Sequence, residues 1–310
     1  MKIIFMGTPE FAAISLRELI AGEDEIVAIF TQPDKPKGRG KPVSSSPVKL
    51  IAEEMKIPLF TPLSLKGDDV FNTIKNYDHE LIIVVAYGQI IPGNILNLPK
   101  YGCINAHASL LPQYRGAAPI QRAIMQGAEE TGISIIKLIE ELDAGPIILQ
   151  EKVKIEENET YGSLHDRLAK LAAKCLIEAC SLIRNNKFNL EKQDEKFATY
   201  AYKLKSEEEV IEWSATAKCI HDHIQALDPA PGAFSTIRGH RIKIFSSRLI
   251  KSCGTGTPGN IIDIKKDGIL IQAGEGIIKI AEVQPANKKR MSAVEFVNGA
   301  RISKGHRFGD

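Results

Sequence analysis

The sequence predicts an open, largely parallel α/β sheet of the Rossmann-like kind, followed by a small β-barrel of the oligonucleotide-binding type. The stretch 80–86 is too apolar for a surface strand and is typical of a strand buried on both faces of a parallel sheet. Strand-like and helix-like segments alternate up to about residue 184. Beyond residue 232 the pattern changes to short strands separated by Gly and Asp-Gly turns. We therefore expect an α/β domain over 1–188, a polar linker over 189–206 and a barrel domain over 207–310.

The chain opens with a strand–turn–helix pattern. Lys2–Met6 has the composition of a buried strand, and the turn that follows contains Thr8 and Pro9. Thr8 is predicted to cap the helix N-terminus, with Pro9 at the first helical position. The turn lacks the G-x-G-x-x-G pattern, which makes a dinucleotide site a weak hypothesis.

A long basic connection, 31–49, follows the predicted strand 25–30. It contains four prolines and two glycines, and its charged residues are Lys35, Lys37, Arg39, Lys41 and Lys49 against Asp34. Connections of this length are functional or disordered. A basic loop beside a ligand-binding edge can follow a phosphate backbone, while a solvated loop without a partner has the same composition.

The rest of the first domain follows the same alternation. Apolar periodicity over 160–184 predicts a long packing helix. The remaining predicted helices and strands are 47–56, 57–60, 67–76, 119–127, 132–138 and 145–150.

Candidate catalytic residues lie at the end of the strand predicted over 102–105. Asn105 and His107 are two residues apart, so in extended chain they share one face at the edge where such sheets bind ligands. An amide donor beside a group that titrates near neutrality suits acyl chemistry, and a carboxylate would complete the set. Asp143, in the loop between two predicted strands, is the candidate carboxylate. The structural alternative is a packed histidine and an aspartate that forms a turn.

Four segments of the sequence support the hypothesis that these residues are catalytic. They are the run Asn105-Ala-His-Ala-Ser-Leu-Leu-Pro-Gln-Tyr-Arg-Gly-Ala-Ala-Pro119, the short segment 142–145, the opening 4–12 and the stretch 30–40. The first two resemble the signature of the folate-dependent formyltransferases. The last two resemble the methionyl-tRNA branch of that family, and the resemblance runs nearly end to end.

The resemblance implies a reaction and its partners. A formyl group would pass from 10-formyltetrahydrofolate, a cosubstrate, to the α-amine of methionyl initiator tRNA, with no metal. It implies catalytic roles for Asn105, His107 and Asp143. It implies folate contacts from 87–92 and from Ser109, Leu110, Leu111 and Pro112, and tRNA contacts from Lys35, Lys37, Arg39 and Lys41. The alternatives are a formyltransferase for a small amine, such as glycinamide ribonucleotide or an amino sugar, and a nucleic-acid-binding protein on a non-catalytic transferase scaffold.

The charge is distributed unevenly. Residues 1–217 carry a net charge of −5 and residues 218–310 a net charge of +7, which sum to the +2 of the whole chain. A basic C-terminal part suggests a polyanionic partner, although a mildly basic domain without one has the same charge. The strands expected there are 233–237, 241–245, 260–264, 269–272 and 276–280.

The remaining features favour a cytoplasmic protein. The five cysteines form no C-x-x-C pair, which indicates reduced thiols rather than disulfides or a zinc site. His221 and His223, two apart in a helix predicted over 214–227, point about 200° around the axis from each other and cannot share a metal. We find no signal sequence and no apolar run long enough for a membrane span. We expect a monomer.

Overall fold

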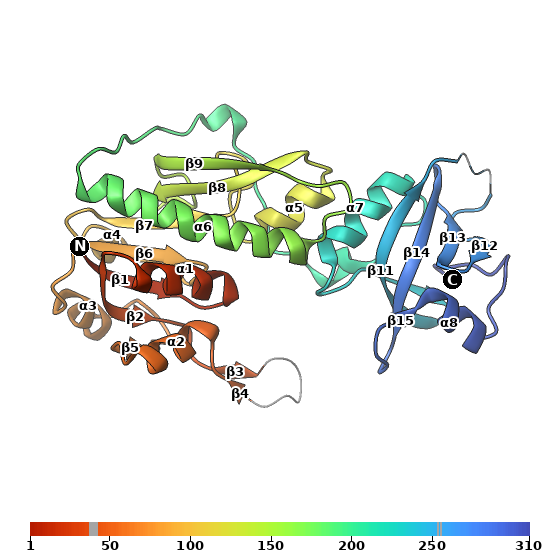
Figure 1. The fold of residues 1–310 in the computed structure, drawn as a ribbon, viewed down its shortest axis with the longest axis horizontal. Helices are drawn as coiled ribbons and strands as arrows, with labels where there is room; N and C mark the ends of the chain where they lie inside the picture. The colour runs from red at the N-terminus through yellow and green to blue at the C-terminus, as the bar shows by residue number, and fades with distance from the viewer. Residues whose placement is uncertain (37–42, 253, 255) are drawn as a thin grey trace. The chain divides into compact units, whose positions relative to one another are not determined.

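The computed structural model describes residues 1–36, 43–252, 254 and 256–310 (Figure 1). They form two compact units, and each unit is assembled from separate stretches of the chain. The first unit comprises 1–116, 131–153 and 165–201; the second comprises 117–130, 154–164 and 202–310. Residues 189–201, inside the predicted linker, thus lie with the first unit, and the boundaries expected at 188 and 207 stay a prediction.

A seven-stranded sheet forms the centre of the first unit. Among the described residues its order is β5-β2-β1-β6-β7-β8-β9, parallel from β5 to β7 and antiparallel between β7 and β8. The sequence-based prediction of an open, largely parallel sheet is confirmed. The bounds are β1 Lys2–Gly7, β2 Glu25–Phe30, β5 Leu59–Phe60, β6 Leu81–Val85, β7 Cys103–His107, β8 Glu130–Lys137 and β9 Ile147–Lys154.

Helices cover both faces of this sheet. On one face, Ile4 and Met6 of β1 pack with Ile74 of α3 and Ile95 of α4. Figure 1 shows α1 and α6 along the other face. All five residues of β6 are buried, as expected for a strand covered on both sides. The helix bounds are α1 Glu10–Ala21, α2 Pro47–Met55, α3 Asp68–Lys75, α4 Gly93–Leu96 and α6 Tyr161–Arg184, and the 3-10 helix η1 covers Glu195–Phe197.

The predicted helix cap at Thr8 is wrong. Helix α1 begins at Glu10 with Pro9 in the N-cap position, and no side chain caps it. The hydroxyl of Thr8 instead donates to the carbonyl of Tyr87 (3.1 Å) and accepts from the amide of Gln32 (3.3 Å). Thr8 follows β1, whose neighbours in the sheet are β2 and β6, so its hydroxyl satisfies backbone groups beyond both strands.

The second unit is built on an antiparallel sheet. Its order is β10-β11-β14-β13-β12, with β15 paired to β14. The strands expected from the sequence are present and all their pairings are antiparallel among the described residues, while a closed barrel stays a prediction. The bounds are β10 Phe234–Ile237, β11 His240–Ile250, β12 Ile261–Lys265, β13 Gly268–Gln272, β14 Ile277–Pro285 and β15 Met291–Ser292.

Helices complete the second unit. Helix α5 (Pro119–Met125) packs against α7 (Ala217–Leu227), although nearly a hundred residues separate them in sequence. A 3-10 helix, η2, covers Ser206–Glu209, and α8 (Ala293–Gly299), which the sequence did not predict, begins with a Ser292 capping box. No helix of the described stretches is long and apolar enough to cross a membrane.

Two histidines, His221 buried and His223 partly buried, are expected to make the stability of the second unit depend on pH. Both lie in α7: Nδ1 of His221 is 2.9 Å from Oγ of Ser247, and burial lowers the pKa of His221 and of His223. Within the described residues no cluster of three or more His, Cys, Asp or Glu could hold a metal ion. Burial thus disfavours the charged form of both imidazoles.

We expect the free energy of unfolding of the second unit to decrease on acidification. Because the pKa of each histidine is lower in the folded state, the unfolded chain binds protons first as the pH falls below about 6.5. Urea unfolding at about pH 7.5 and about pH 5.5 should show a larger loss in the wild type than in His221→Gln. Equal losses in both proteins would contradict this account.

Candidate active site

The candidate catalytic side chains lie at the carboxyl edge of the central sheet. In β7, Asn105 pairs with Val84 of β6 on one side and with Ile136 of β8 on the other, and the strand ends at His107. Asn105 is half-buried and lies two residues before His107, so both are on the same face of the strand. The placement predicted for these two residues relative to the strand is therefore found in the structure.

The surroundings of His107 define the proton positions on its ring. The side chain is buried, and Nε2 lies 2.9 Å from the carbonyl oxygen of Tyr114. A carbonyl oxygen can only accept, so Nε2 carries a hydrogen. In the neutral ring Nδ1 is then the basic nitrogen, and it faces Oδ2 of Asp143 at 3.6 Å. The sequence did not predict the contact with Tyr114.

Asp143 is held by backbone geometry. It lies in the loop between β8 and β9 with φ of 50°, in the left-handed region that a residue with a side chain rarely adopts. Its Oδ2 accepts a hydrogen bond from the amide of Gly116 at 2.8 Å. The structure thus brings His107 and Asp143 together from segments 36 residues apart in sequence, and their catalytic roles stay a prediction.

The Ser-Leu-Leu-Pro stretch folds around a buried serine network. The hydroxyl of Ser109 donates to the carbonyl of Gln113 (2.6 Å). Oγ of Ser134 donates to the carbonyl of Ser109 (2.7 Å) and accepts from the amide of Leu111 (3.0 Å), whose carbonyl accepts from Nε2 of Gln150 (3.0 Å). These bonds shape the loop, and the hydroxyl of Ser109 serves the loop backbone.

The predicted folate-binding residues differ in accessibility. Ser109 and Leu111 are buried, whereas Leu110 and Pro112 are partly exposed. Leu110 and Pro112 are therefore the members of this group whose side chains can form an apolar wall for a ligand. Folate contact by any of the four stays a prediction.

A second apolar rim comes from the segment 87–92. Oε1 of Gln89 accepts from the amide of Leu65, and its Nε2 donates to the carbonyl of Pro62, both at 3.1 Å. Ile90 is 84% exposed on this tethered segment, and Leu142, beside Asp143, is 60% exposed. Exposed apolar side chains on fixed loops beside a strand edge suit a flat, partly apolar ligand.

The loop between β8 and β9 lies close to the start of α4. A side chain placed on Gly93, at the start of α4, would collide with the carboxylate of Glu140. The loop that carries Asp143 therefore lies against the segment that follows residues 87–92. Ile90 and Leu142 thus lie exposed on neighbouring segments, and their contact with a pterin stays a prediction.

Comparison with known proteins identifies the fold and its family. The family model described as "Formyl transferase" matches residues 1–180, and the model of the formyl transferase C-terminal domain matches 203–301. The chain belongs to the formyl transferase family. Relatives named methionyl-tRNA formyltransferase occur in Bacillus cytotoxicus, 44% identical over 100% of this chain and 99% of the relative, and in Syntrophomonas wolfei, 45% identical over 98% of each.

Solved structures share the fold of this formyl transferase at lower identity. The sugar 3N-formyl transferase WlaRD superposes with a TM-score of 0.69 over 93% of this chain and 99% of that chain, at 22% identity. HypX from Aquifex aeolicus in complex with tetrahydrofolic acid superposes with a TM-score of 0.64 over 96% of this chain and 47% of that chain, at 18% identity.

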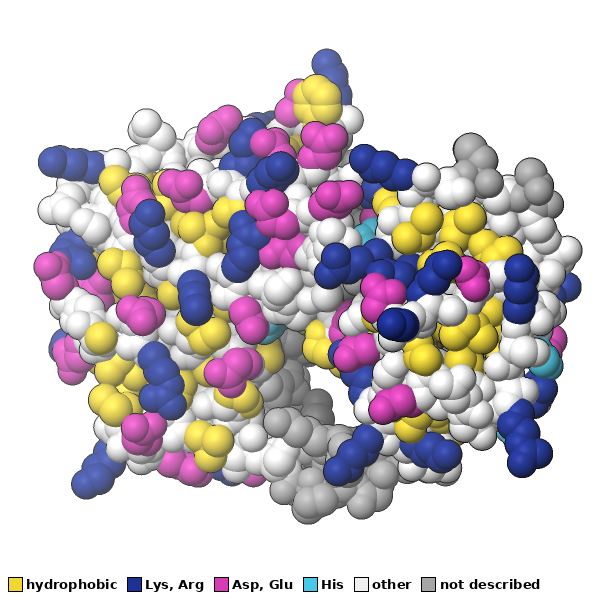
Figure 2. Space-filling model, turned by 45° about the vertical axis from the view of Figure 1, so that its right-hand side comes forward, with side chains coloured by type: hydrophobic (Ala, Val, Ile, Leu, Met, Phe, Trp, Pro, Cys, Tyr) yellow, Lys and Arg dark blue, Asp and Glu magenta, His cyan; other side chains and the backbone are white. Residues whose placement is uncertain are grey.

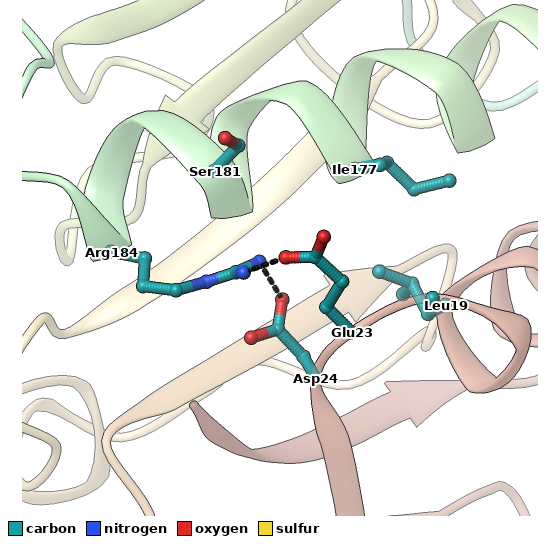
Figure 3. Close-up of a pocket in the computed structure, with 7 residues that line it drawn as sticks. Leu19, Glu23, Asp24, Ile177, Ser181 and Arg184 are labelled. Carbon is teal, nitrogen blue, oxygen red and sulfur yellow. Dashed lines mark hydrogen bonds and ion pairs between the residues drawn. The ribbon is translucent and has the colours of Figure 1, made fainter.

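A cavity of about 190 Å³ lies at the amino edge of the central sheet, opposite the carboxyl edge that carries His107 (Figure 3). Arg184, at the end of α6, forms ion pairs there with Glu23 and Asp24, which immediately precede β2. The amino end of β2 is remote from the carboxyl edge that carries His107. These ion pairs tie α6 to the turn before β2, and we assign this cavity a structural role.

Cys103, the first residue of β7, is not available as a nucleophile. Its side chain is fully buried, and burial raises the pKa of the thiol to about 12. At neutral pH it is a thiol rather than a thiolate, which is the reactive form.

Most of the residues predicted to contact tRNA fall outside the described residues. Lys37, Arg39 and Lys41 lie outside them, and of Lys35 only the backbone is described, in the short strand β3 (Lys35–Pro36), which pairs with β4 (Val43–Ser44). Asp34, the one acidic residue of this connection in the sequence, binds Nζ of Lys49 at 2.6 Å.

A polar cluster around Arg115 was not predicted from the sequence. The guanidinium of Arg115, 2% exposed, binds Glu195 at 2.7 and 2.9 Å, and this hydrogen bond raises the pKa of Arg115. The same guanidinium binds Oε1 of Gln193 at 2.7 and 3.0 Å. Gln193 and Glu195 lie in the polar stretch predicted as a linker, which carries no local signal for such a role.

Proposed function

We propose that this chain transfers a formyl group from 10-formyltetrahydrofolate to the α-amine of methionyl initiator tRNA. The observation that carries this proposal is similarity over the whole length, at 41–45% identity, to relatives named methionyl-tRNA formyltransferase. Translation uses aminoacylated tRNA in the cytoplasm, where we expect the protein to act as a monomer.

The reaction requires stabilisation of negative charge on the formyl oxygen. The methionyl amine attacks the formyl carbon, so that oxygen gains charge before the bond to the folate nitrogen breaks. A side-chain amide aimed at this oxygen stabilises the transition state. Asn105, on the accessible strand edge, supplies that donor.

The reaction also moves a proton from the attacking amine to the leaving nitrogen. Nε2–H of His107 is engaged by the carbonyl of Tyr114, so proton exchange takes place at Nδ1. Nδ1 and Oδ2 of Asp143 are 3.6 Å apart, longer than a direct hydrogen bond. A water or an amine hydrogen placed between them would bond to both and pass a proton through His107.

Charge favours tRNA over a small amine as the acceptor. The basic connection 31–49 and the net charge of +7 over 218–310 supply cations that a sugar or a small ribonucleotide would not need. Figure 2 shows Lys and Arg side chains spread over the second unit, with fewer acidic ones among them. Sugar formyl transferases share the fold at about one-fifth sequence identity. Similarity at that level does not indicate that this chain uses a sugar as its acceptor.

The test is product identification with purified protein. Methionyl initiator tRNA and 10-formyltetrahydrofolate should yield N-formylmethionyl-tRNA and tetrahydrofolate in equal amounts, measured by mass spectrometry of the released amino acid and by folate absorbance. Asp143→Asn is the matched negative control. Formation of tetrahydrofolate without formation of N-formylmethionyl-tRNA would overturn the assignment of methionyl-tRNA as the acceptor.

Arg39 offers a sharper test of the loop. Arg39→Lys keeps the charge but loses the planar, two-point donor set that matches phosphate or a base edge. We expect kcat/KM for methionyl initiator tRNA to fall by about tenfold to a hundredfold, as for loss of a charge-assisted contact of about 1.5–3 kcal/mol.

Arg39→Ala should be at least as harmful, with folate binding and thermal stability unchanged in both variants. Lys49→Arg, at the ion pair with Asp34, is the control: it also exchanges one cation for another in this connection and should leave kcat/KM close to that of the wild type. Wild-type efficiency of Arg39→Lys would reduce Arg39 to generic charge, and wild-type efficiency of Arg39→Ala would remove it from tRNA recognition.

A further inference from the structure

We propose that Gln193 is a positioning residue that fixes the two loops holding His107. One loop, 113–116, supplies the carbonyl that binds Nε2 of His107; the other, 139–145, carries Asp143. Gln193 belongs to neither loop and reaches both through its side-chain amide. The kinetic part of this inference rests on the proposed function, and its structural part does not.

The contacts of Gln193 use both ends of the amide. Oε1 accepts from Nε and Nη2 of Arg115, at 3.0 and 2.7 Å. Nε2 donates to the carbonyls of Asp143 and Gly145, both at 2.7 Å. The side chain is 4% exposed, so these bonds form away from competing water. Arg115 directly follows Tyr114, one partner of His107, and Asp143 is the other partner, so Gln193 fixes the separation between them.

The backbone near Gln193 also supports this arrangement. The amide and carbonyl of Glu191 bond to the carbonyl and amide of Ile147, just beyond the second loop, at 2.9 and 2.8 Å. The amide of Arg115 donates to the carbonyl of Thr199 (2.8 Å), and the amide of Ala201 donates to the carbonyl of Arg115 (2.7 Å). Oγ1 of Thr199 accepts from the amide of Tyr114 (2.9 Å). The segment 193–201 is thus bound along the first loop by its backbone, and Gln193 extends this attachment to the Asp143 loop.

Both loops carry a residue that needs support. Tyr114 and Asp143 have φ values of 60° and 50°, in the left-handed region that disfavours residues with side chains. Such conformations persist where the surroundings determine them. Each of these residues provides a contact to His107, so relaxation of either loop would move a partner of the ring.

An amide is the side chain that fits these four contacts. Glutamate would keep the acceptor for Arg115 but would lose both donors and place a negative charge against two carbonyls. Methionine has nearly the same length and provides neither a donor nor a charge. Gln193→Glu therefore removes the contact to the Asp143 loop alone, and Gln193→Met removes both contacts without burying a charge.

The matched control is Gln225→Glu. Gln225 in α7 is also 4% exposed, and its Nε2 donates to the carbonyl of Asn158 at 2.8 Å, within the second unit. We expect Gln193→Glu and Gln193→Met to lower kcat by about tenfold to a hundredfold, as for a displacement of about 1 Å at a catalytic group. KM for both substrates should change less than about threefold, and Gln225→Glu should keep kcat within about threefold of the wild type.

A spectroscopic readout separates positioning from loss of fold. In protein with ¹⁵N-labelled histidine, His107, identified by its loss in His107→Asn, should show the Nε2–H tautomer in the wild type. Both Gln193 variants should shift the two ring nitrogens of His107 and leave those of His221 unchanged. Gln193→Met introduces no buried charge. If Gln193→Glu does not fold, Gln193→Met can still be compared with the wild type.

The outcomes are distinct. A fall in kcat together with displaced His107 signals supports the proposal. Unchanged His107 signals in a folded Gln193 variant overturn it, as does a fall in kcat no greater than that of Gln225→Glu. If the wild type does not formylate methionyl-tRNA, the proposed function fails while the spectra still decide the role of Gln193.

Discussion

Replacing His107 with Ala, or Asp143 with Asn, is expected to lower kcat for formyl transfer by about a hundredfold or more, the usual scale for a positioned acid–base group. His107→Ala removes the basic Nδ1, and Asp143→Asn replaces an oxygen that faces it at 3.6 Å. Neither change alters the apolar rims around the site, so folate affinity should change much less than turnover. Steady-state kinetics with methionyl initiator tRNA, together with folate titration, measure both effects.

Two controls test whether the location of the residues matters. His79→Ala and Asp78→Asn change the same residue types just before β6, at the amino edge of the sheet, where Nδ1 of His79 lies 2.7 Å from the carbonyl of Tyr77. Both should keep turnover within about threefold of the wild type. Near-normal turnover of the folded His107 and Asp143 variants would remove these residues from catalysis.

Gly145→Ala should cause the largest loss of stability among single substitutions near the site. A methyl group at Gly145 would overlap the carbonyl oxygen and carbon of Lys137, whose own amide is bonded to the carbonyl of Pro146. Because β8 is paired with β7, the carbonyl of Lys137 cannot move away freely. We expect the free energy of unfolding to fall by on the order of 3 kcal/mol, at the upper end for overpacking.

Urea unfolding of Gly145→Ala measures this loss, with Gly299→Ala in α8 as the control. A methyl group at Gly299 would meet no heavy atom within 4 Å, so that variant should stay within about 1 kcal/mol of the wild type. Equal stability of the two variants would show that the β8–β9 connection yields more easily than its contacts indicate.

Local sequence patterns were sufficient to predict the central sheet and the position of the candidate residues. The apolar run that forms β6 and the pairing of β7 beside it follow from burial on both faces of a parallel sheet. Once those strands are placed, Asn105 and His107 must lie at the carboxyl edge. Asp143 could be proposed because it lies in a loop between two strand-like runs. Its contact with His107 was not predictable, because β8 is antiparallel to β7 and ends opposite Ile104, so the loop has to fold back toward the ring.

Long-range contacts were not predictable in this way. The assignment of 117–130 and 154–164 to the second unit depends on packing between segments such as α5 and α7, which no local periodicity records. A shortened chain ending near residue 205 would lack α7, and α5 would lose the helix against which it packs. Such a chain would therefore be a poor test of whether the second unit binds tRNA. The role of Gln193 was hidden for the same reason, because its partners are 48 to 78 residues away.

The structure also narrows a choice that the sequence left open. Asn-x-His at a strand end allows the histidine to donate directly to the formyl oxygen or to handle the proton. The carbonyl of Tyr114 occupies Nε2, so the geometry favours Asn105 for the oxygen and Nδ1 of His107 for the proton. Tyr114 contributes this contact through its backbone, and a backbone carbonyl has no signature in the sequence.

The most direct test of the central claim is a comparison of acceptors. Purified protein with 10-formyltetrahydrofolate would be assayed side by side with methionyl initiator tRNA, glycinamide ribonucleotide and a nucleotide-linked amino sugar. The account predicts that kcat/KM for methionyl initiator tRNA exceeds that for either small amine by about a hundredfold or more. A kcat/KM for glycinamide ribonucleotide or the amino sugar equal to or above that for the tRNA would contradict it.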